Sequence, residues 1–400
     1  MRTGDFPSTT SQTLGQFWVP SSEDSTVPGI LEIDGPDVQL QVSPELTPMF
    51  TIEKTGPGSS TVKIVDEPDD MAILGSIPLR PLKVTLWDAY TAAHNQIGGP
   101  FLAQRGRGTS RQTLRATWCV VGNHLPDPNT PLYGARPEVT NLTEWAQISP
   151  LSITVHPGDN LKLDWHMNLR NKSQDVELPN GAGYLTLSPS AVTNRPNLRG
   201  LHVTTTCQLE IELIHGWSLR DITVRVAQPL ADLMTLLSGK PCVTRSLDVW
   251  ADTWCSVHGY QIDPSGAESA GELFFTRPQV HPEFLPRWLE LHHRLTPVPQ
   301  ILAAVVRNEF PTVEADALSL ATAVESLHRA LEPGARRFTS EHINESLSAI
   351  EESTMPKNVA HAVSTALRQY LYEYSYPQRV SVAMRKSPSV ASRKYPLVAR

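Results

Sequence analysis

The amino-acid sequence predicts an α+β protein in which a large β-rich N-terminal domain, sandwich- or barrel-like, precedes an α-helical bundle. Three observations predict this fold class. Short apolar runs separated by Pro, Gly, Asn and Asp fill the chain up to about residue 278, which is typical of strands and turns. The segment His202–Leu213 alternates apolar and polar residues, as a half-buried strand does. Beyond Pro278 the apolar period changes from two residues to about 3.6, the period of a helix.

Weaker strand patterns accompany His202–Leu213 throughout the β-rich region. They are Leu31–Ile33, Thr61–Val65, Lys83–Trp87, Thr117–Gly122, Ser152–Val155, Lys162–His166, Tyr184–Leu187, Asp221–Val226, Ser246–Trp250 and Glu272–Phe275. The run Gly56–Ser60 predicts a turn that leads one strand back into the next. Many short strands at loose spacing favour a sandwich or barrel, with one irregular helix among them. They do not support a parallel βαβ architecture.

Helical periodicity begins at Phe284–Leu295. Two prolines, Pro297 and Pro299, then interrupt the chain before Ile301–Val306. The stripe of apolar residues over Val313–Leu331 predicts a long helix that ends before Pro333-Gly334. Another helix starts near Thr339 or Ser340, either of which is a good N-cap, and a last one follows Pro356 and extends to Tyr374.

These patterns divide the chain into three parts. A chain of 400 residues is too long for one core, because single cores rarely exceed about 250 to 300 residues. We expect a β-rich domain over residues 1–278, a helical linker over residues 279–310 and a partial helical domain over residues 311–400. The tail from Pro377 is short and polar, so the bundle is expected to be incomplete at its C-terminal end.

Composition indicates a soluble protein. The chain lacks the run of about 18 apolar residues that a membrane span needs. Met1–Gln12 is polar and does not resemble a secretory signal, so we expect a cytoplasmic location and no membrane contact. We expect neither a metal nor any other cofactor. The four cysteines lie too far apart in sequence for a zinc site, which predicts buried structural thiols.

Any nucleic-acid-binding surface must be local, because the formal net charge is −7. The C-terminal tail is one basic candidate, and its predicted RNA-binding residues are Arg385, Lys386, Arg393 and Lys394. A second basic stretch comprises Arg105, Arg107, Arg111 and Arg115. It suits contact with a nucleic acid or with an acidic protein, although a solvated hairpin is the more economical interpretation.

Several segments, in this order, resemble the ApeA-type anti-phage proteins, in which a β-rich N-terminal domain precedes a HEPN domain. The resemblance lies in Gly15–Pro20 with Pro28–Leu31, Trp118–Leu125, Leu142–Trp145, Leu233–Pro241, Trp288–Leu291 and Ala323–Arg329. The last segment resembles the first HEPN helix. Their order and spacing extend over nearly the whole chain.

The resemblance implies a bacterial abortive-infection protein that senses a phage-derived trigger and cleaves tRNA or other cellular RNA without a metal. It also implies a homodimer formed through the HEPN bundle. The HEPN signature is an Arg, a polar residue and, further along a late helix, a His. Histidine suits general acid–base chemistry on the ribose because its pKa is near neutral, and the guanidinium stabilises charge on the phosphate.

The expected Arg-polar-His motif is not found after Val359–Tyr374, where the resemblance would place it, because no histidine follows His361. Arg337 with His342 has the right spacing but the wrong position, and Arg287 with His292 lies in the linker. Glu325 resembles a polar residue that points at the active site of related nucleases. Its alternative role is an exposed partner for Arg329, four residues along the helix.

Two explanations for the missing motif stay open: a truncated or frame-shifted chain, which we favour, and a natural inactive form that keeps the sensor. An endoribonuclease and a binding protein without catalysis are therefore both retained as hypotheses. A third hypothesis, a carbohydrate-binding or structural β-sandwich, rests on the tryptophan-rich strands alone.

Overall fold

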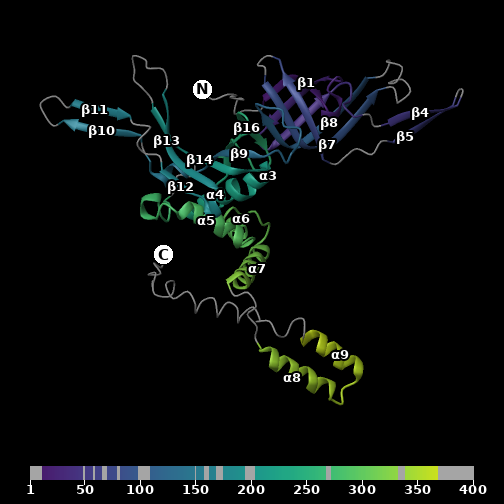
Figure 1. Ribbon diagram of the computed structural model, residues 1–400, viewed down its shortest axis with the longest axis vertical. Coiled ribbons are helices and arrows are strands. Elements are labelled where there is room, and N and C mark those ends of the chain that lie inside the picture. The colour runs from purple at the N-terminus through teal and green to yellow at the C-terminus, as the bar shows by residue number, and fades with distance from the viewer. Residues whose placement is uncertain are drawn as a thin grey trace. The chain divides into compact units, whose positions relative to one another are not determined.

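A closed six-stranded barrel forms the first part of the structure (Figure 1). The computed structural model describes residues 11–47, 50–56, 59–64, 70–78, 82–97, 109–148, 150–156, 162–167, 174–193, 203–266, 272–331 and 338–367. The barrel strands are β1 (Ser11–Trp18), β2 (Val27–Asp34), β3 (Asp37–Val42), β6 (Met71–Ile77), β7 (Leu82–Ile97) and β8 (Thr109–Val121). They pair in the order β8-β3-β2-β1-β6-β7, and β7 pairs again with β8, which closes the ring. Side chains such as Phe17, Leu31 and Leu114 are fully buried and fill the interior.

The same twelve-stranded sheet continues beyond the barrel through β8, and this continuation is called the second sheet below. Its strands are β9 (Leu132–Val139), β12 (Gln174–Glu177), β13 (Gly183–Thr193), β14 (Val203–Trp217), β15 (Thr244–Trp250) and β16 (Trp254–Gly259). Their order from β8 is β16-β15-β9-β14-β13-β12, and neighbouring strands are antiparallel. The predicted alternation of β14 is confirmed over Cys207–Leu213, because Cys207, Leu209, Ile211 and Leu213 are buried while the three residues between them are more exposed. Two separate hairpins pair β4 (Phe50–Gly56) with β5 (Ser59–Ile64) and β10 (Leu151–His156) with β11 (Lys162–Met167).

Helices cover one face of the second sheet (Figure 1). They are α2 (Leu142–Ala146), α3 (Leu219–Ile222), the π-helical turn η3 (Thr223–Ala227), α4 (Gln228–Ser238) and the beginning of α5 (Phe284–Arg294). Short 3-10 turns are η1 (Pro20–Ser22), η2 (Pro179–Gly181) and η4 (Arg277–Gln279). Leu285 and Leu289 of α5 lie in the same core as the sheet, and Trp288 Nε1 donates a hydrogen bond to the carbonyl of Pro229 at 2.8 Å.

Two predicted strands are wrong. The segment Asp221–Val226 is helical, because the Ser218 hydroxyl caps the helix and the buried positions Ile222, Val226 and Leu230 recur every four residues. The apparent alternation came from Val224, which is 45% exposed. The segment Glu272–Phe275 forms no strand; its Phe275 ring instead packs edge-on against Phe284, with ring centroids 5.3 Å apart.

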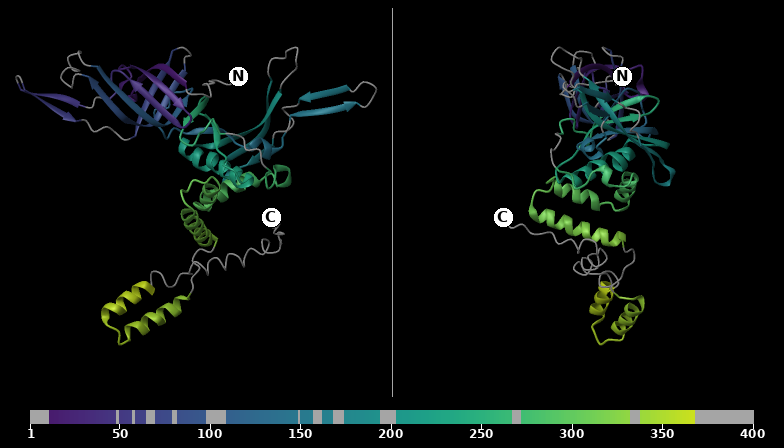
Figure 2. Two further views of the ribbon diagram at one scale, coloured as in Figure 1. Left: turned by 180° about the vertical axis from the view of Figure 1, so that it is seen from behind. Right: turned by 90° about the vertical axis from the view of Figure 1, so that its left-hand side faces the viewer.

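The chain divides into two compact units, Met1–Glu290 and Leu291–Arg400. The predicted boundaries at residues 278 and 310 stay predictions. The second unit contains α6 (Val298–Val306), α7 (Val313–Leu331), α8 (Ser340–Glu351) and α9 (Lys357–Ala366). Helix α7 has its predicted limits, and the predicted N-cap at Thr339 is confirmed, because its hydroxyl accepts from the backbone N–H of His342 at 3.3 Å. Helices α8 and α9 lie side by side (Figure 2).

The α+β fold class predicted from the sequence is thus confirmed, with a β-rich region first and helices after it. All four cysteines are buried thiols that form no disulfide, as predicted. Burial raises the pKa of Cys207 to about 12, and burial with nearby Asp248 and Asp252 raises that of Cys255 to about 11. Such thiols stay protonated and unreactive near neutral pH. Within the described ranges, the helices are too short or too polar to cross a membrane.

His258 makes the stability of the β-rich unit depend on pH. His258 on β16 is the cross-strand partner of Cys119 on β8. Burial lowers the pKa of the His258 imidazole to about 4. In the unfolded chain His258 takes up a proton near pH 6.5, whereas in the folded chain it does so only near pH 4. The free energy of unfolding therefore decreases as the pH falls from about 6.5 toward 4. Between about pH 7.5 and 5, we expect the wild-type protein to lose about 2 kcal/mol more unfolding free energy than His258→Gln. Urea denaturation followed by tryptophan fluorescence measures this difference, and parallel pH profiles would contradict the assignment.

Candidate binding pocket at the branch of strand β8

Strand β8 changes its partner halfway along one edge. Residues Gln112–Ala116 pair with β3, and residues Trp118–Val121 pair with β16. The opposite edge of β8 pairs with β7 along nearly its full length. Because β3 and β16 diverge at Thr117, a recess opens between the barrel and the second sheet. It has a volume of about 260 Å³.

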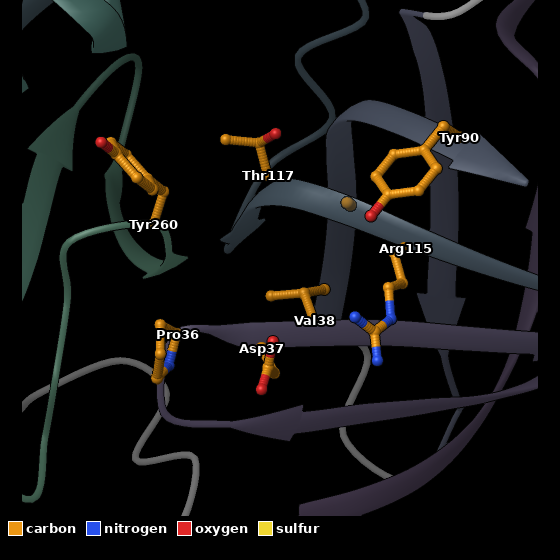
Figure 3. A pocket seen from close by; sticks show the side chains of 8 residues that line it. Pro36, Asp37, Val38, Tyr90, Arg115, Thr117 and Tyr260 are labelled. Carbon is orange, nitrogen blue, oxygen red and sulfur yellow. The ribbon is translucent and has the colours of Figure 1, made fainter. Parts of the chain in front are cut away.

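The floor of this pocket is small and mostly apolar, and its rim is polar (Figure 3). Val38 and Ala116 are buried and Thr117 is half-buried, so these three side chains form the floor. Tyr90 and Arg115 stand on one side of the recess, and Tyr260 stands across from them (Figure 3). The two tyrosines are 46% and 55% exposed, so their rings are available to a ligand.

Tyr90 and Arg115 are held together by the sheet register. They are direct partners on β7 and β8, and both side chains are exposed on the outer surface of the barrel. Direct cross-strand neighbours have Cβ atoms about 5 Å apart, so the ring and the guanidinium form one surface. In the part of the chain that the structure describes, no ion pair or side-chain hydrogen bond engages Arg115. Its charge is therefore open to an incoming anion.

Tyr260 is positioned by the residue that precedes it. Gly259 has a φ of +117°, and a Cβ there would lie only 2.2 Å from the carbonyl oxygen of Thr117. The absence of a side chain lets the backbone of β16 approach β8 closely, so the N–H of Tyr260 donates to that same oxygen at 2.9 Å. The Tyr260 ring then meets the edge of Trp118 at a right angle, with centroids 5.9 Å apart.

A tight hairpin turn places the remaining rim residues. Strands β2 and β3 are joined by Gly35-Pro36, where Gly35 has a φ of +56° and Pro36 follows. Glycine at the first position of a two-residue loop is typical of turns that match the twist of a hairpin. The turn sets Pro36 and Asp37 at the pocket rim, below Val38 in the same strand.

The arrangement suits binding rather than catalysis. Two aromatic faces, one guanidinium and one carboxylate surround an apolar floor, which is the composition of a recognition site. Asp88, which precedes Tyr90 by two residues on β7 and does not line the pocket, has a pKa raised above its ordinary value by burial and by Asp70, with Arg220 acting in the opposite direction. The described residues include no cluster of His, Cys, Asp and Glu that would hold a metal ion.

A comparison with protein families establishes the relationship of this chain. Residues 12–253 match the family described as ApeA N-terminal domain 1, which is more than half of the 400-residue sequence. The chain belongs to the ApeA N-terminal domain family. The predicted resemblance to ApeA-type anti-phage proteins is thereby confirmed. Comparisons with curated proteins and with solved structures found no match.

The ApeA N-terminal domain match runs from β1 to the turn after β15. It therefore includes the whole barrel and most of the second sheet. Every residue that lines the pocket, except Tyr260, lies within the matched range. The ApeA relationship gives the protein a role in anti-phage defence, and the pocket lies in the part of the chain that carries this relationship.

The predicted nuclease residues lie outside the ApeA N-terminal domain match. Glu325 is on α7, where its Oε1 accepts from the guanidinium of Arg329 at 2.9 Å, the pairing foreseen as the alternative to catalysis. His342 is exposed in the first turn of α8. Arg337 and the predicted RNA-binding residues Arg385, Lys386, Arg393 and Lys394 lie outside the described residues, so these assignments stay predictions.

Arg287 and His292, the pair in the predicted linker, lie in different environments. Arg287 forms an ion pair with Glu283, the residue just before α5, whereas the side chain of His292 is almost completely buried. An exposed arginine and a buried histidine on one helix do not face a common site. Arg287 thus belongs to a solvated helix face and His292 to a packing contact.

The basic stretch Arg105–Arg115 is the sequence feature that contributes a predicted residue, Arg115, to the pocket. Arg105 and Arg107 lie outside the described residues, while Arg111 and Arg115 are exposed on β8 and Arg115 lines the recess. Sequence reasoning missed Tyr90, Tyr260 and Asp37. The turn signal Asp34–Asp37 and the pair Gly259-Tyr260 were the available local signs, because glycines next to polar residues mark exposed turns.

Proposed function

We propose that this protein is an abortive-infection effector of anti-phage defence. Its β-rich region senses a phage-derived trigger, and its helical region is a HEPN-type ribonuclease that cleaves tRNA or other cellular RNA without a metal. The protein acts in the cytoplasm as a homodimer formed through the helical bundle. The observation that carries this proposal is the match to the ApeA N-terminal domain over residues 12–253.

The pocket supports the sensing role. Its rim presents exposed tyrosines and an arginine, the residue types that contribute most to specific recognition in protein interfaces. The barrel interior offers no comparable site, because closely packed apolar side chains fill it. A trigger therefore has a preformed place to bind on the outer surface of the β-rich unit.

Features of the helical unit support the nuclease role more weakly. Glu325 lies on helix α7, whose sequence contains the segment that resembles the first HEPN helix. The same helix exposes Val313, Leu318 and Leu331, apolar side chains that a dimer interface would cover. In this proposal His342 acts as the general acid or base, Arg337 steadies the phosphate and Glu325 orients one of them.

The nuclease proposal makes a direct prediction. The purified 400-residue chain, mixed with tRNA, a chelator and lysate from phage-infected cells, is expected to cleave the RNA. His342→Ala and Glu325→Gln should each reduce the cleavage rate about 100-fold or more, because a general acid–base group typically contributes this factor. Cleavage is followed on denaturing gels.

Matched control variants come from the same helical unit. His361→Ala on α9 removes another exposed histidine, and Glu314→Gln removes another carboxylate from α7. Both should cleave at the wild-type rate. Cleavage that survives His342→Ala would refute the assigned residues, and intact RNA with the wild-type protein would refute the nuclease proposal.

A catalytically inactive or truncated sensor that recognises a phage product is the second candidate function. The missing Arg-polar-His motif in the sequence favours it, and the pocket at β8 serves it equally well. This candidate predicts a stable complex with a phage product, protection or signalling that depends on Arg115, and no loss of cellular RNA.

A further inference from the structure

We propose that the pocket at β8 binds an acidic peptide segment exposed on a protein partner. Arg115 takes a carboxylate of the segment, and Tyr90 and Tyr260 hold the side chain next to it. The inference rests on the proposed sensing function, since it names the chemical class of the trigger.

Arg115 is the residue that determines the charge of the expected ligand. The guanidinium is exposed on the pocket rim, and within the described part of the chain it forms no ion pair. A guanidinium matches a carboxylate with two parallel hydrogen bonds, which makes arginine a preferred partner for acidic side chains. The direct neighbour of Arg115 on β3 is the neutral Gln39, which separates Arg115 from Glu32 on β2.

The charges around the pocket favour a peptide over a nucleic acid. Asp37 lines the same recess, and Glu32 lies two strands away from Arg115 in the same cross-strand row. A nucleic-acid backbone carries a phosphate at every nucleotide, so it would bring several negative charges against these carboxylates and against a chain of net charge −7. A peptide can place a single carboxylate on Arg115 and direct a backbone N–H or a basic group toward Asp37.

The dimensions of the recess agree with a side-chain anchor. About 260 Å³ lies just below the range of roughly 300–1,000 Å³ that is typical of small-molecule pockets. One or two side chains fill such a space, with the apolar floor of Val38 and Ala116 beneath them. The bulk of the partner then rests on the exposed tyrosine rings.

The sheet holds the backbone of both tyrosines in place. Tyr260 is held by its backbone hydrogen bond to Thr117 and by the edge of Trp118, and Tyr90 is fixed by its position within the longest strand. Aromatic rings that are already ordered lose little conformational entropy on binding. Preorganised tyrosines around one arginine are therefore expected to produce measurable affinity for a short segment.

Selection from a random peptide library displayed on phage particles tests the proposal on the purified 400-residue chain. Wild-type protein is expected to enrich sequences that contain Asp or Glu beside an aromatic or aliphatic residue. Synthetic peptides with the enriched sequences should bind Arg115→Gln and Tyr260→Ser about tenfold or more weakly, as loss of a central anchor does. Calorimetry measures these affinities, and replacing the acidic residue of the peptide by its amide should weaken binding to a similar extent.

Two exposed residues outside the pocket give the controls. Arg111→Gln removes an arginine from the same strand, and Tyr184→Ser removes a tyrosine that is 48% exposed on β13. Both variants should bind the peptides as the wild-type protein does. No enrichment of acidic peptides, or affinities that Arg115→Gln and Tyr260→Ser leave unchanged, would overturn the proposal.

A labelled single-stranded RNA oligonucleotide provides the second arm. Binding of this RNA that depends on Arg115, without binding of acidic peptides, would overturn the proposal in favour of a nucleic-acid ligand. The peptide measurements need neither RNA cleavage nor infected cells. If the protein binds the peptides but has no effect on phage infection, the defence function alone is contradicted. If the protein protects cells but does not bind the peptides, the peptide-binding inference alone is contradicted.

Discussion

Replacing Gly259 by alanine is expected to lower the free energy of unfolding of the β-rich unit by about 4 kcal/mol, because strain and steric overlap add at one residue. The φ of +117° disfavours any side chain, and the new Cβ would lie 2.2 Å from the carbonyl oxygen of Thr117. Relief of the overlap requires β16 to move away from β8. That movement lengthens the hydrogen bond from the N–H of Tyr260 and displaces one wall of the pocket.

Urea denaturation followed by tryptophan fluorescence measures this effect, since all nine tryptophans lie in the unit Met1–Glu290. Gly35→Ala is the matched control at the same pocket. Gly35 also has a positive φ of +56°, but within the described structure no heavy atom lies within 4 Å of an added Cβ. It should cost only about 1 kcal/mol. Equal destabilisation by the two substitutions would show that the close contact at Thr117 is unimportant.

Trp145→Ala is the second substitution with a large expected effect, a loss of about 3 to 5 kcal/mol of unfolding free energy. Trp145 is 1% exposed on α2, and its ring lies against Phe284 at the start of α5, with centroids 6.3 Å apart. Deleting the indole leaves a cavity between the second sheet and these helices. The same core contains Leu285 and Leu289 of α5.

Circular dichroism and urea denaturation provide the measurement for Trp145→Ala. Trp250→Ala is the control, because that ring is 38% exposed and its removal leaves no enclosed cavity. Combining Trp145→Ala with Phe284→Ala should reveal a coupling free energy of about 0.5 to 1.5 kcal/mol, as expected for two aromatic rings in contact. Strictly additive effects would mean that α5 does not stabilise the β-rich unit through this contact.

The helices illustrate how much local sequence determines. Helix α7 was predicted at Val313–Leu331 because an apolar stripe at helical spacing ends before Pro333-Gly334, and α8 was predicted because Thr339 is an N-cap. The alternation in β14 likewise identified a strand with one buried face. These signals depend on residues that are close together in the sequence, so they can be recognised without knowledge of the tertiary structure.

The strand error at Asp221–Val226 shows where local signals fail. Ile222, Val224 and Val226 alternate like a strand, but the core accepts only Ile222 and Val226 and leaves Val224 exposed. Ser218 then caps the helix that presents those two residues together. A pattern of six residues fits either period, and the surface available for packing decides between them.

By itself, therefore, the sequence determined the α+β class, the order of a β-rich part and a helical part, most of the helices and the relationship to ApeA. The tertiary structure alone decided that β8 leaves the barrel to start a second sheet, and that a pocket forms at this branch. The pocket unites Asp37, Tyr90, Arg115 and Tyr260, residues from four distant segments. The physical reason is that sheet register, set by the burial of many apolar side chains over the whole unit, brings these segments together. Each of the four looks like an ordinary surface residue in its own segment.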